Sequence, residues 1–167
     1  VYAAAQILWS IPRDSFGPGY TSLAMALLFT LVLLHEFGHC FACRAVGGEA
    51  DDILLWPLGG LASCTPPATP RANAITTIGG PAVNAAILPI TAAGLWAVGR
   101  PDTILFNPLA PGDVLISLEG WGVVALWWTH YLNGLLLAFN VIVPMFPMDG
   151  GRLVHAALWA RQGDRAA

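Results

Sequence analysis

Three apolar segments dominate this chain, and each is long enough to cross a lipid bilayer as a helix. They cover residues of about 21–46, 74–98 and 121–143, and a spanning helix needs only about 20 mainly apolar residues. Charged residues make up 10% of the 167 residues and hydrophobic residues 56%, whereas ordinary soluble domains are about 25% charged. The sequence therefore predicts an all-α membrane protein, a polytopic helical bundle with the lipid bilayer as its solvent.

Shorter apolar stretches lie at both ends of the chain. Residues 1–11 are too few to span a bilayer and lack the basic start and the cleavage site of a signal peptide. We interpret them as part of a helix that begins before residue 1. Residues 153–160 predict the start of a further helix. We expect residues 1–167 to form a single core that is truncated at both ends.

The arginines predict how the chain is oriented in the membrane. Two of the seven, Arg13 and Arg100, lie on one side of the predicted spans. The other five lie in the loop between the first two spans or after the third span: Arg44, Arg71, Arg152, Arg161 and Arg165. Positive residues concentrate on the cytoplasmic side of membrane proteins, so we expect that loop and the C-terminal tail to be cytoplasmic. The net charge of −3, with no basic cluster, argues against nucleic acid as a partner.

The loop between the first two spans contains a second apolar feature. Residues 53–61 read ILLWPLGGL, with a proline and a glycine pair that suit a turn. The sequence predicts a short membrane-associated extended segment here, either as two extended pieces or as a segment that dips into the membrane. A surface loop with no role in binding is the alternative. Backbone of this kind persists in the membrane only where it is paired or lines a wet cavity.

The first apolar segment carries a polar cluster, the sequence HEFGH at residues 35–39. In a helix, His35 and His39 lie about 40° apart around the axis, so both imidazoles can reach one metal ion. Glu36, next to the first of them, can act on a water molecule at that ion. Two histidines and a glutamate are costly in hydrocarbon unless they are paired or coordinated. The pattern favours a zinc hydrolase site over core histidines that share this spacing by chance.

A catalytic zinc site usually has three protein ligands, and the depth of each residue in the membrane identifies the third. Asp149 follows a broken helix end shortly before Arg152, and His39 lies shortly before Arg44, so both are expected near the same face. We therefore predict Asp149 as the third ligand of one Zn²⁺ ion. Other candidates are too near the first span, across the membrane or too far from the pair: Glu49, Asp51, Asp52, Asp102, Asp113, Glu119 and His130.

Several further polar or small residues each allow a structural and a functional interpretation. Asn84 and Asn140 are amides within predicted spans, and each either bonds a neighbouring helix or orients a ligand or substrate. Gly80, four residues before Asn84, permits close approach to another helix. The candidate for that neighbour is the predicted helix that contains HEFGH at residues 35–39. Cys40 and Cys43 form a C-x-x-C beside the histidine pair; helix packing is favoured over a redox or second-metal role.

Three motifs together resemble the site-2 proteases, the intramembrane zinc metalloproteases of the M50 peptidase class. They are HEFGH at 35–39, GPAVN at 80–84 and NVIVPMFPMDGGR at 140–152, in the family's order and across nearly the whole chain. The first motif occurs in many zinc proteases, whereas the third is far more specific. The loop at 47–73 is too short for a PDZ insertion, so the resemblance is to the compact type, some of whose members carry C-terminal CBS domains.

The resemblance implies a role for each matching residue. His35, His39 and Asp149 would bind zinc, and Glu36 would be the catalytic acid and base. Asn140 would hold the substrate or its developing oxyanion, with Asn84 as a further substrate-binding residue. Gly59 and Gly60 belong to the segment that resembles the family's extended substrate-binding region. The expected partners are a transmembrane protein substrate and the lipid bilayer, with a regulatory domain beyond residue 167 as a further expectation.

These features predict an intramembrane protease with its active site near the cytoplasmic face. The alternatives are a zinc-binding homologue without catalytic activity and, less favoured, a metal transporter. A transporter would need ligands that thread the membrane, whereas the candidate ligands here cluster at one depth.

Overall fold

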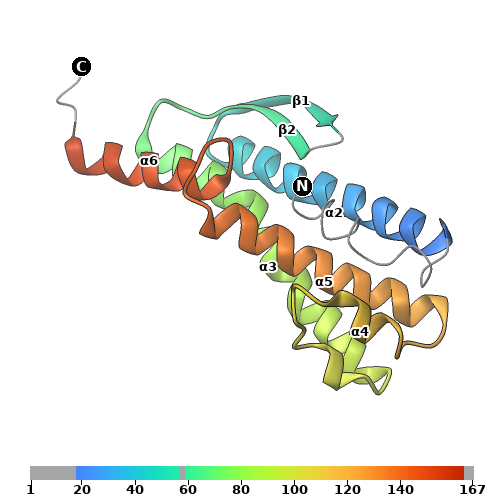
Figure 1. The fold of residues 1–167 in the computed structure, drawn as a ribbon. Coiled ribbons are helices and arrows are strands. Elements are labelled where there is room, and N and C mark those ends of the chain that lie inside the picture. Colours follow the sequence, from blue (N-terminus) through green and yellow to red (C-terminus); the bar gives the residue numbers. More distant parts are fainter. Residues whose placement is uncertain (1–17, 57–58, 164–167) are drawn as a thin grey trace. The chain divides into compact units, whose positions relative to one another are not determined.

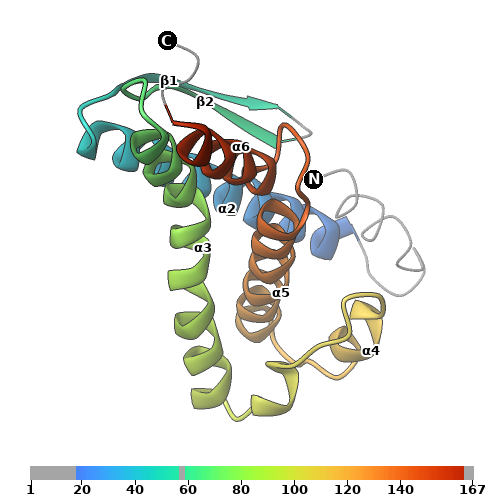
Figure 2. The ribbon, with the colours of Figure 1, turned by 90° about the vertical axis from the view of Figure 1, so that its left-hand side faces the viewer.

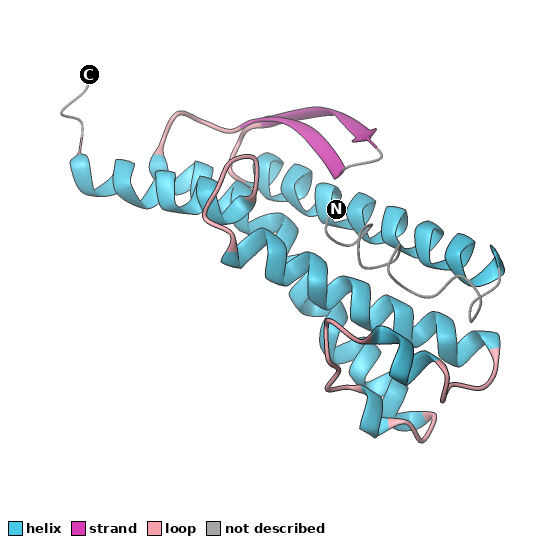
Figure 3. Cartoon of the chain, in the orientation of Figure 1, coloured by secondary structure: helices cyan, strands magenta, loops and turns pink. Residues whose placement is uncertain are grey.

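The computed structural model describes residues 18–56 and 59–163, and within these ranges it is mainly helical (Figures 1 and 3). In chain order the elements are α2 (Pro18–Ala45), β1 (Glu49–Trp56), β2 (Gly59–Thr65), α3 (Pro70–Ala97), the 3₁₀-helix η1 (Pro101–Thr103), α4 (Pro111–Leu115), α5 (Trp121–Ile142) and α6 (Asp149–Gln162). The predicted partial helix at 1–11 lies outside the described residues.

Three of these helices are long and apolar enough to cross a membrane: Gly19–Ala45 in α2, Pro70–Ala97 in α3 and Trp121–Ile142 in α5. They match the predicted spans and confirm the expected helical membrane fold. Pro81 and Pro89 lie inside α3, which is drawn as one unbroken helix in Figure 2. Membrane helices tolerate proline because neighbouring groups can satisfy the freed carbonyls.

The segment between the first two spanning helices forms an antiparallel hairpin. β1 pairs with β2 from Glu49↔Thr65 to Trp56↔Gly59. The register shifts between Ala50 and Asp52, so Asp51 is an extra residue of the kind that makes a β-bulge. The predicted extended segment is therefore present as two paired strands.

The chain divides into two compact units, which are described separately. The first comprises residues 1–31 and 85–136. Its described core is built on α5, where Trp127 and Tyr131 are fully buried. Trp127 Nε1 donates to the carbonyl of Thr103 over 3.2 Å, and the Tyr131 hydroxyl donates to the carbonyl of Pro108 over 2.9 Å. These bonds satisfy the polar ends of large apolar side chains.

His130 belongs to the same unit and has structural partners there. Its Nδ1 lies 2.7 Å from Thr91 Oγ1, and its Nε2 lies 3.2 Å from the carbonyl oxygen of Ile104. A carbonyl can only accept, so Nε2 carries the proton and Nδ1 accepts from the threonine hydroxyl. Both ring nitrogens are therefore used within the fold.

The second unit comprises residues 32–84 and 137–167 and contains all four residues predicted for the zinc chemistry. Its helix α6 begins at Asp149, a full turn before the predicted start at residue 153. Two glycines allow this early start, because the backbone folds back tightly here. A Cβ on Gly150 would lie 2.7 Å from the carbonyl oxygens of Val141 and Val143, and one on Gly151 would lie 2.7 Å from the Met145 carbonyl carbon.

Candidate metal site

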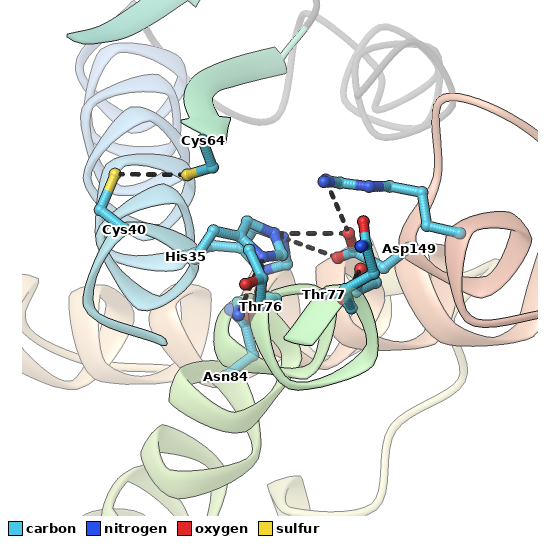
Figure 4. A network of polar contacts seen from close by, with 11 residues as sticks. His35, Cys40, Cys64, Thr76, Thr77, Asn84 and Asp149 are labelled. Atoms are coloured by element: carbon cyan, nitrogen blue, oxygen red, sulfur yellow. Dashed lines mark hydrogen bonds and ion pairs between the residues drawn. The ribbon is translucent and has the colours of Figure 1, made fainter. Parts of the chain in front are cut away.

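The two histidines of α2 and the aspartate of α6 meet in the second unit (Figure 4). His35 and His39 lie one helical turn apart, and their Nε2 atoms are 3.1 Å apart. Asp149 Oδ2 lies 3.1 Å from His35 Nε2, and Oδ1 lies 3.4 Å from His39 Nε2. All three side chains are buried. Within the described ranges, this is the one group of three or more histidine, cysteine or acidic residues placed to hold a metal ion.

The opposite nitrogen of each imidazole is held by α3. His35 Nδ1 lies 2.5 Å from Asn84 Oδ1. His39 Nδ1 lies 2.9 Å from the carbonyl oxygen of Thr76, closer than the backbone nitrogen of Gly80 at 3.3 Å. Amide and carbonyl oxygens only accept, so both Nδ1 atoms carry the ring proton. Both Nε2 atoms of the neutral rings then present lone pairs toward Asp149.

This donor set fits a divalent metal ion. Two imidazole lone pairs and a carboxylate at about 3 Å repel one another unless a cation or protons lie between them. Asp149 Oδ2 is buried and receives no hydrogen bond, although His35 Nε2 is close. Two histidines and one carboxylate form a known ligand set of catalytic zinc sites, which leaves a fourth position open. The residues present therefore fit the expected zinc ion.

The backbones of α2 and α3 come into close contact next to the site. A Cβ on Gly38 would lie 2.3 Å from the carbonyl oxygen of Gly79, and one on Gly79 would lie 2.3 Å from that of Gly38. The next residue, Gly80, faces the ligands: its Cβ would lie 2.4 Å from His39 Nε2 and 2.6 Å from His35 Nε2. Any side chain at residue 80 would occupy the space into which the ligand atoms point.

Asp149 is held in its charged form. Burial alone would raise the pKa of Asp149, but hydrogen bonds from His35 and His39, which exist when those rings carry a second proton, lower it to about 2. Arg152, one turn further along α6, lies 3.9 Å from Asp149 Oδ1 and is 36% exposed. Protons and a metal ion thus compete for the same lone pairs.

The other residues predicted for catalysis and substrate binding differ in burial and in the element that carries them. Glu36 is buried on α2 between the two histidines in sequence. Asn84 is fully buried against His35. Asn140 is partly buried near the end of α5. Gly59 and Gly60 lie in β2, paired with Trp56 and Leu55.

Sequence reasoning missed three contributors to the site. The carbonyl of Thr76 gave no signal, because every residue has one. Arg152 was read only as an orientation signal, although its position three residues after Asp149 places it on the same helix face. Gly80 was read as a helix-packing residue; its contact with the ligand atoms depends on how α3 crosses α2.

Comparison with known proteins agrees with this site. The model of peptidase family M50 matches residues 23–107. Rip3 of Mycobacterium tuberculosis, named as a candidate zinc metalloprotease, is 33% identical over 143 residues, which cover 83% of this chain and 31% of Rip3. Zinc metalloprotease MJ0392 of Methanocaldococcus jannaschii is 31% identical over 145 residues, covering 86% of this chain and 37% of that protein.

A third relative is similar over more of the chain. The protein sll0528 of Synechocystis, also named as a candidate zinc metalloprotease, is 34% identical over 163 residues, covering 96% of this chain and 38% of the relative. The chain thus spans about a third of the length of these relatives. No solved structure matches it significantly. The family match covers more than half of the chain and includes the paired histidines, so the chain belongs to peptidase family M50, the class of the site-2 proteases.

Proposed function

We propose that this chain is the core of an intramembrane zinc metalloprotease that hydrolyses peptide bonds of membrane-spanning or membrane-associated proteins. The observation that carries the proposal is the convergence of two imidazole lone pairs and the Asp149 carboxylate in a buried site. The names of the relatives, all zinc metalloproteases, support the same activity.

In this proposal His35, His39 and Asp149 hold one zinc ion. A zinc ion there supplies Lewis-acid chemistry, which activates water and polarises the scissile carbonyl. Glu36 acts as the general base that takes a proton from the attacking water and as the acid that returns it to the leaving amine. Its burial next to His35 supports this role, because a dry site strengthens the electrostatic interactions of a proton-transfer group.

Residues around the metal ligands divide into two roles. The short contact with His35 supports a positioning role for Asn84, which fixes the tautomer and orientation of the ring. We propose that Asn140 holds the substrate or its developing oxyanion, and that Gly59 and Gly60 lie in the strand that receives it. The hairpin supports the role of Gly59 and Gly60 in substrate binding, because a two-stranded sheet has an outer edge at which an extended peptide can pair.

Family membership and three apolar helices indicate an integral membrane protein. We propose that the chain crosses the membrane several times and that the site opens near the cytoplasmic face. The arginine distribution supports this orientation, since Arg44 follows His39 by five residues at the end of α2. A helical substrate must unwind locally there, because its amides are otherwise hidden in helical hydrogen bonds.

The test is the variant Glu36→Gln, with Glu49→Gln in the hairpin as a matched control. We expect Glu36→Gln to keep zinc but to stop cleavage, so that an uncut membrane protein accumulates in cells that express it. Glu49→Gln should behave as wild type. Zinc measured after purification should fall by about one ion per chain in Asp149→Ala. Cleavage that persists in Glu36→Gln would contradict the proposed role.

A further inference from the structure

The three cysteines of the chain form a cluster of their own, and one of them directly follows the candidate ligand His39. Cys40 and Cys43 lie on α2, and Cys64 lies on β2. Cys40 and Cys43 are buried, and together with Ala50 they form a small core cluster against which Cys64 packs. None is in a disulfide, and Cys64 is the most accessible of the three.

Cys64 and Cys40 are the pair of this cluster whose sulfurs make a direct contact across the two elements. Cys64 Sγ lies 4.0 Å from Cys40 Sγ, although the two residues are 24 positions apart in the sequence (Figure 4). Cys43 also neighbours Cys64, but its thiol donates to the carbonyl oxygen of Glu49 over 3.4 Å. The sequence pattern C-x-x-C therefore does not identify the pair that is best placed to react.

We propose that Cys40 and Cys64 are a modification site and form an intramolecular disulfide that joins α2 to β2. A disulfide bond is about 2.05 Å long, so the sulfurs at 4.0 Å must approach by about 2 Å. In this proposal, rotation of the two side chains and a shift of the strand supply this movement.

The oxidant is a small-molecule disulfide, such as oxidised glutathione. The thiolate of Cys64, the accessible partner, attacks one sulfur of the oxidant and releases one thiol. Cys40 Sγ then displaces the second thiol and forms the bond to Cys64. Two electrons pass to the oxidant, and the two protons of the cysteine thiols leave on the two released thiols.

The environment of Cys64 makes this reaction slow. Burial, and then the neighbouring thiols of Cys40 and Cys43, raise the pKa of Cys64 to about 12. A low thiolate fraction at neutral pH slows the attack, so the pair calls for equilibration in the oxidising buffer rather than brief exposure.

The disulfide would join the hairpin to the helix that carries two of the candidate ligands. Cys40 directly follows the candidate ligand His39 in α2. Cys64 lies in the strand that also contains Gly59 and Gly60. Oxidation would thus fix this strand to the helical turn that carries His39, and reduction would release it.

The experiment maps the bond in the full-length protein in detergent. The protein is equilibrated in glutathione buffers of increasing oxidised share, free thiols are alkylated, and the denatured protein is digested with chymotrypsin. Cleavage after Phe41 separates Cys40 from Cys43, so mass spectrometry assigns the partner of Cys64 without ambiguity. We expect a Cys40–Cys64 cross-linked peptide pair that increases with the oxidised share and disappears on reduction with dithiothreitol.

Variants with matched changes complete the test. Cys43→Ala should keep the cross-link, and Cys64→Ala should abolish it, while both keep wild-type zinc content and elution in detergent as controls for folding. A wild-type protein whose Cys40 and Cys64 stay alkylatable in fully oxidised buffer would overturn the proposal. A Cys43–Cys64 link, or separate glutathione adducts on the two cysteines, would overturn it as well. None of these outcomes bears on the proposed protease activity, because the readout is the bond itself.

Discussion

Gly80 lies so close to His39 that a Cβ at residue 80 would fall 2.4 Å from the imidazole Nε2. The absence of a side chain at Gly80 thus leaves space for the metal ion toward which both Nε2 atoms point. In a membrane helix, glycine usually serves close packing of two backbones. Here Gly79 fulfils that role against Gly38, whereas Gly80 faces the ligand atoms.

The first prediction concerns this glycine. We expect Gly80→Ala to abolish stoichiometric zinc binding, because the new methyl group would occupy the metal position. Gly94→Ala, further along α3, is the control, since its Cβ would meet only the flexible end of Leu126 at 3.1 Å. Replacing glycine by alanine improves helix propensity by about 1 kcal/mol at either site, so a difference between the two variants does not come from helix propensity. Full zinc content in purified Gly80→Ala would refute the proposed position of the metal.

The second prediction concerns the amide that holds His35. Removing Asn84 Oδ1 leaves the ring free to rotate, and changes of this kind typically weaken metal binding by about 10- to 100-fold. We expect that loss in Asn84→Ala, measured by competition with a zinc chelator. Asn84→Asp keeps an acceptor oxygen and should retain most of the affinity. Equal affinities for wild type and Asn84→Ala would show that the contact does not position the ligand.

The third prediction concerns pH. The histidines bind metal only as neutral rings, so acidification should release zinc as the two rings take up protons. In the metal-free site burial raises the pKa of Asp149, but hydrogen bonds from the two rings, once each carries a second proton, outweigh burial and lower that pKa to about 2. The stability that this carboxylate contributes is therefore present above its unfolded pKa of about 3.9 and is lost only as the pH falls toward 2.

Zinc content measured across a pH series shows whether protonation of the two imidazoles or of the Asp149 carboxylate releases the metal. We expect release with a midpoint above the unfolded carboxylate pKa of about 3.9, and with a slope that reflects two protons. A midpoint below that value would mean that the carboxylate, and not the imidazoles, limits binding.

The fourth prediction compares two neighbours on α6. Arg152 is 36% exposed and lies 3.9 Å from Asp149, and partly exposed ion pairs of this kind contribute at most about 1 kcal/mol. Arg152→Gln should therefore weaken zinc binding by less than about tenfold, whereas Asp149→Asn should remove it. Zinc titrations of the two purified variants test this difference. A loss in Arg152→Gln as large as that in Asp149→Asn would indicate that the arginine holds the carboxylate in place.

The spanning helices could be predicted from the sequence because their signal is local. Each long apolar run must satisfy its own backbone in the bilayer, and a helix is the form that does so within one segment. Depth in the membrane then placed Asp149 at the level of His39, and the structure brings these two residues together. The short elements η1 and α4 gave no such signal, since so few residues depend on contacts elsewhere in the chain.

The supporting contacts of the site could not be predicted in the same way. A buried amide such as Asn84 has many possible partners on neighbouring helices, and only the crossing of α2 and α3 selects His35. The same holds for Cys64, whose nearest thiol is on another element. The start of α6 at Asp149 was missed because apolar periodicity begins only at residue 153, after the double glycine.

The placement of the ligands in the sequence has a consequence for biosynthesis. His35 and His39 lie in the first spanning helix, whereas Asp149 follows the third. A ribosome must therefore translate most of the chain before the last ligand leaves it, and the histidine pair alone offers zinc only two protein ligands. The order of the sequence thus delays completion of the metal site until the three apolar helices of the described residues have been synthesised.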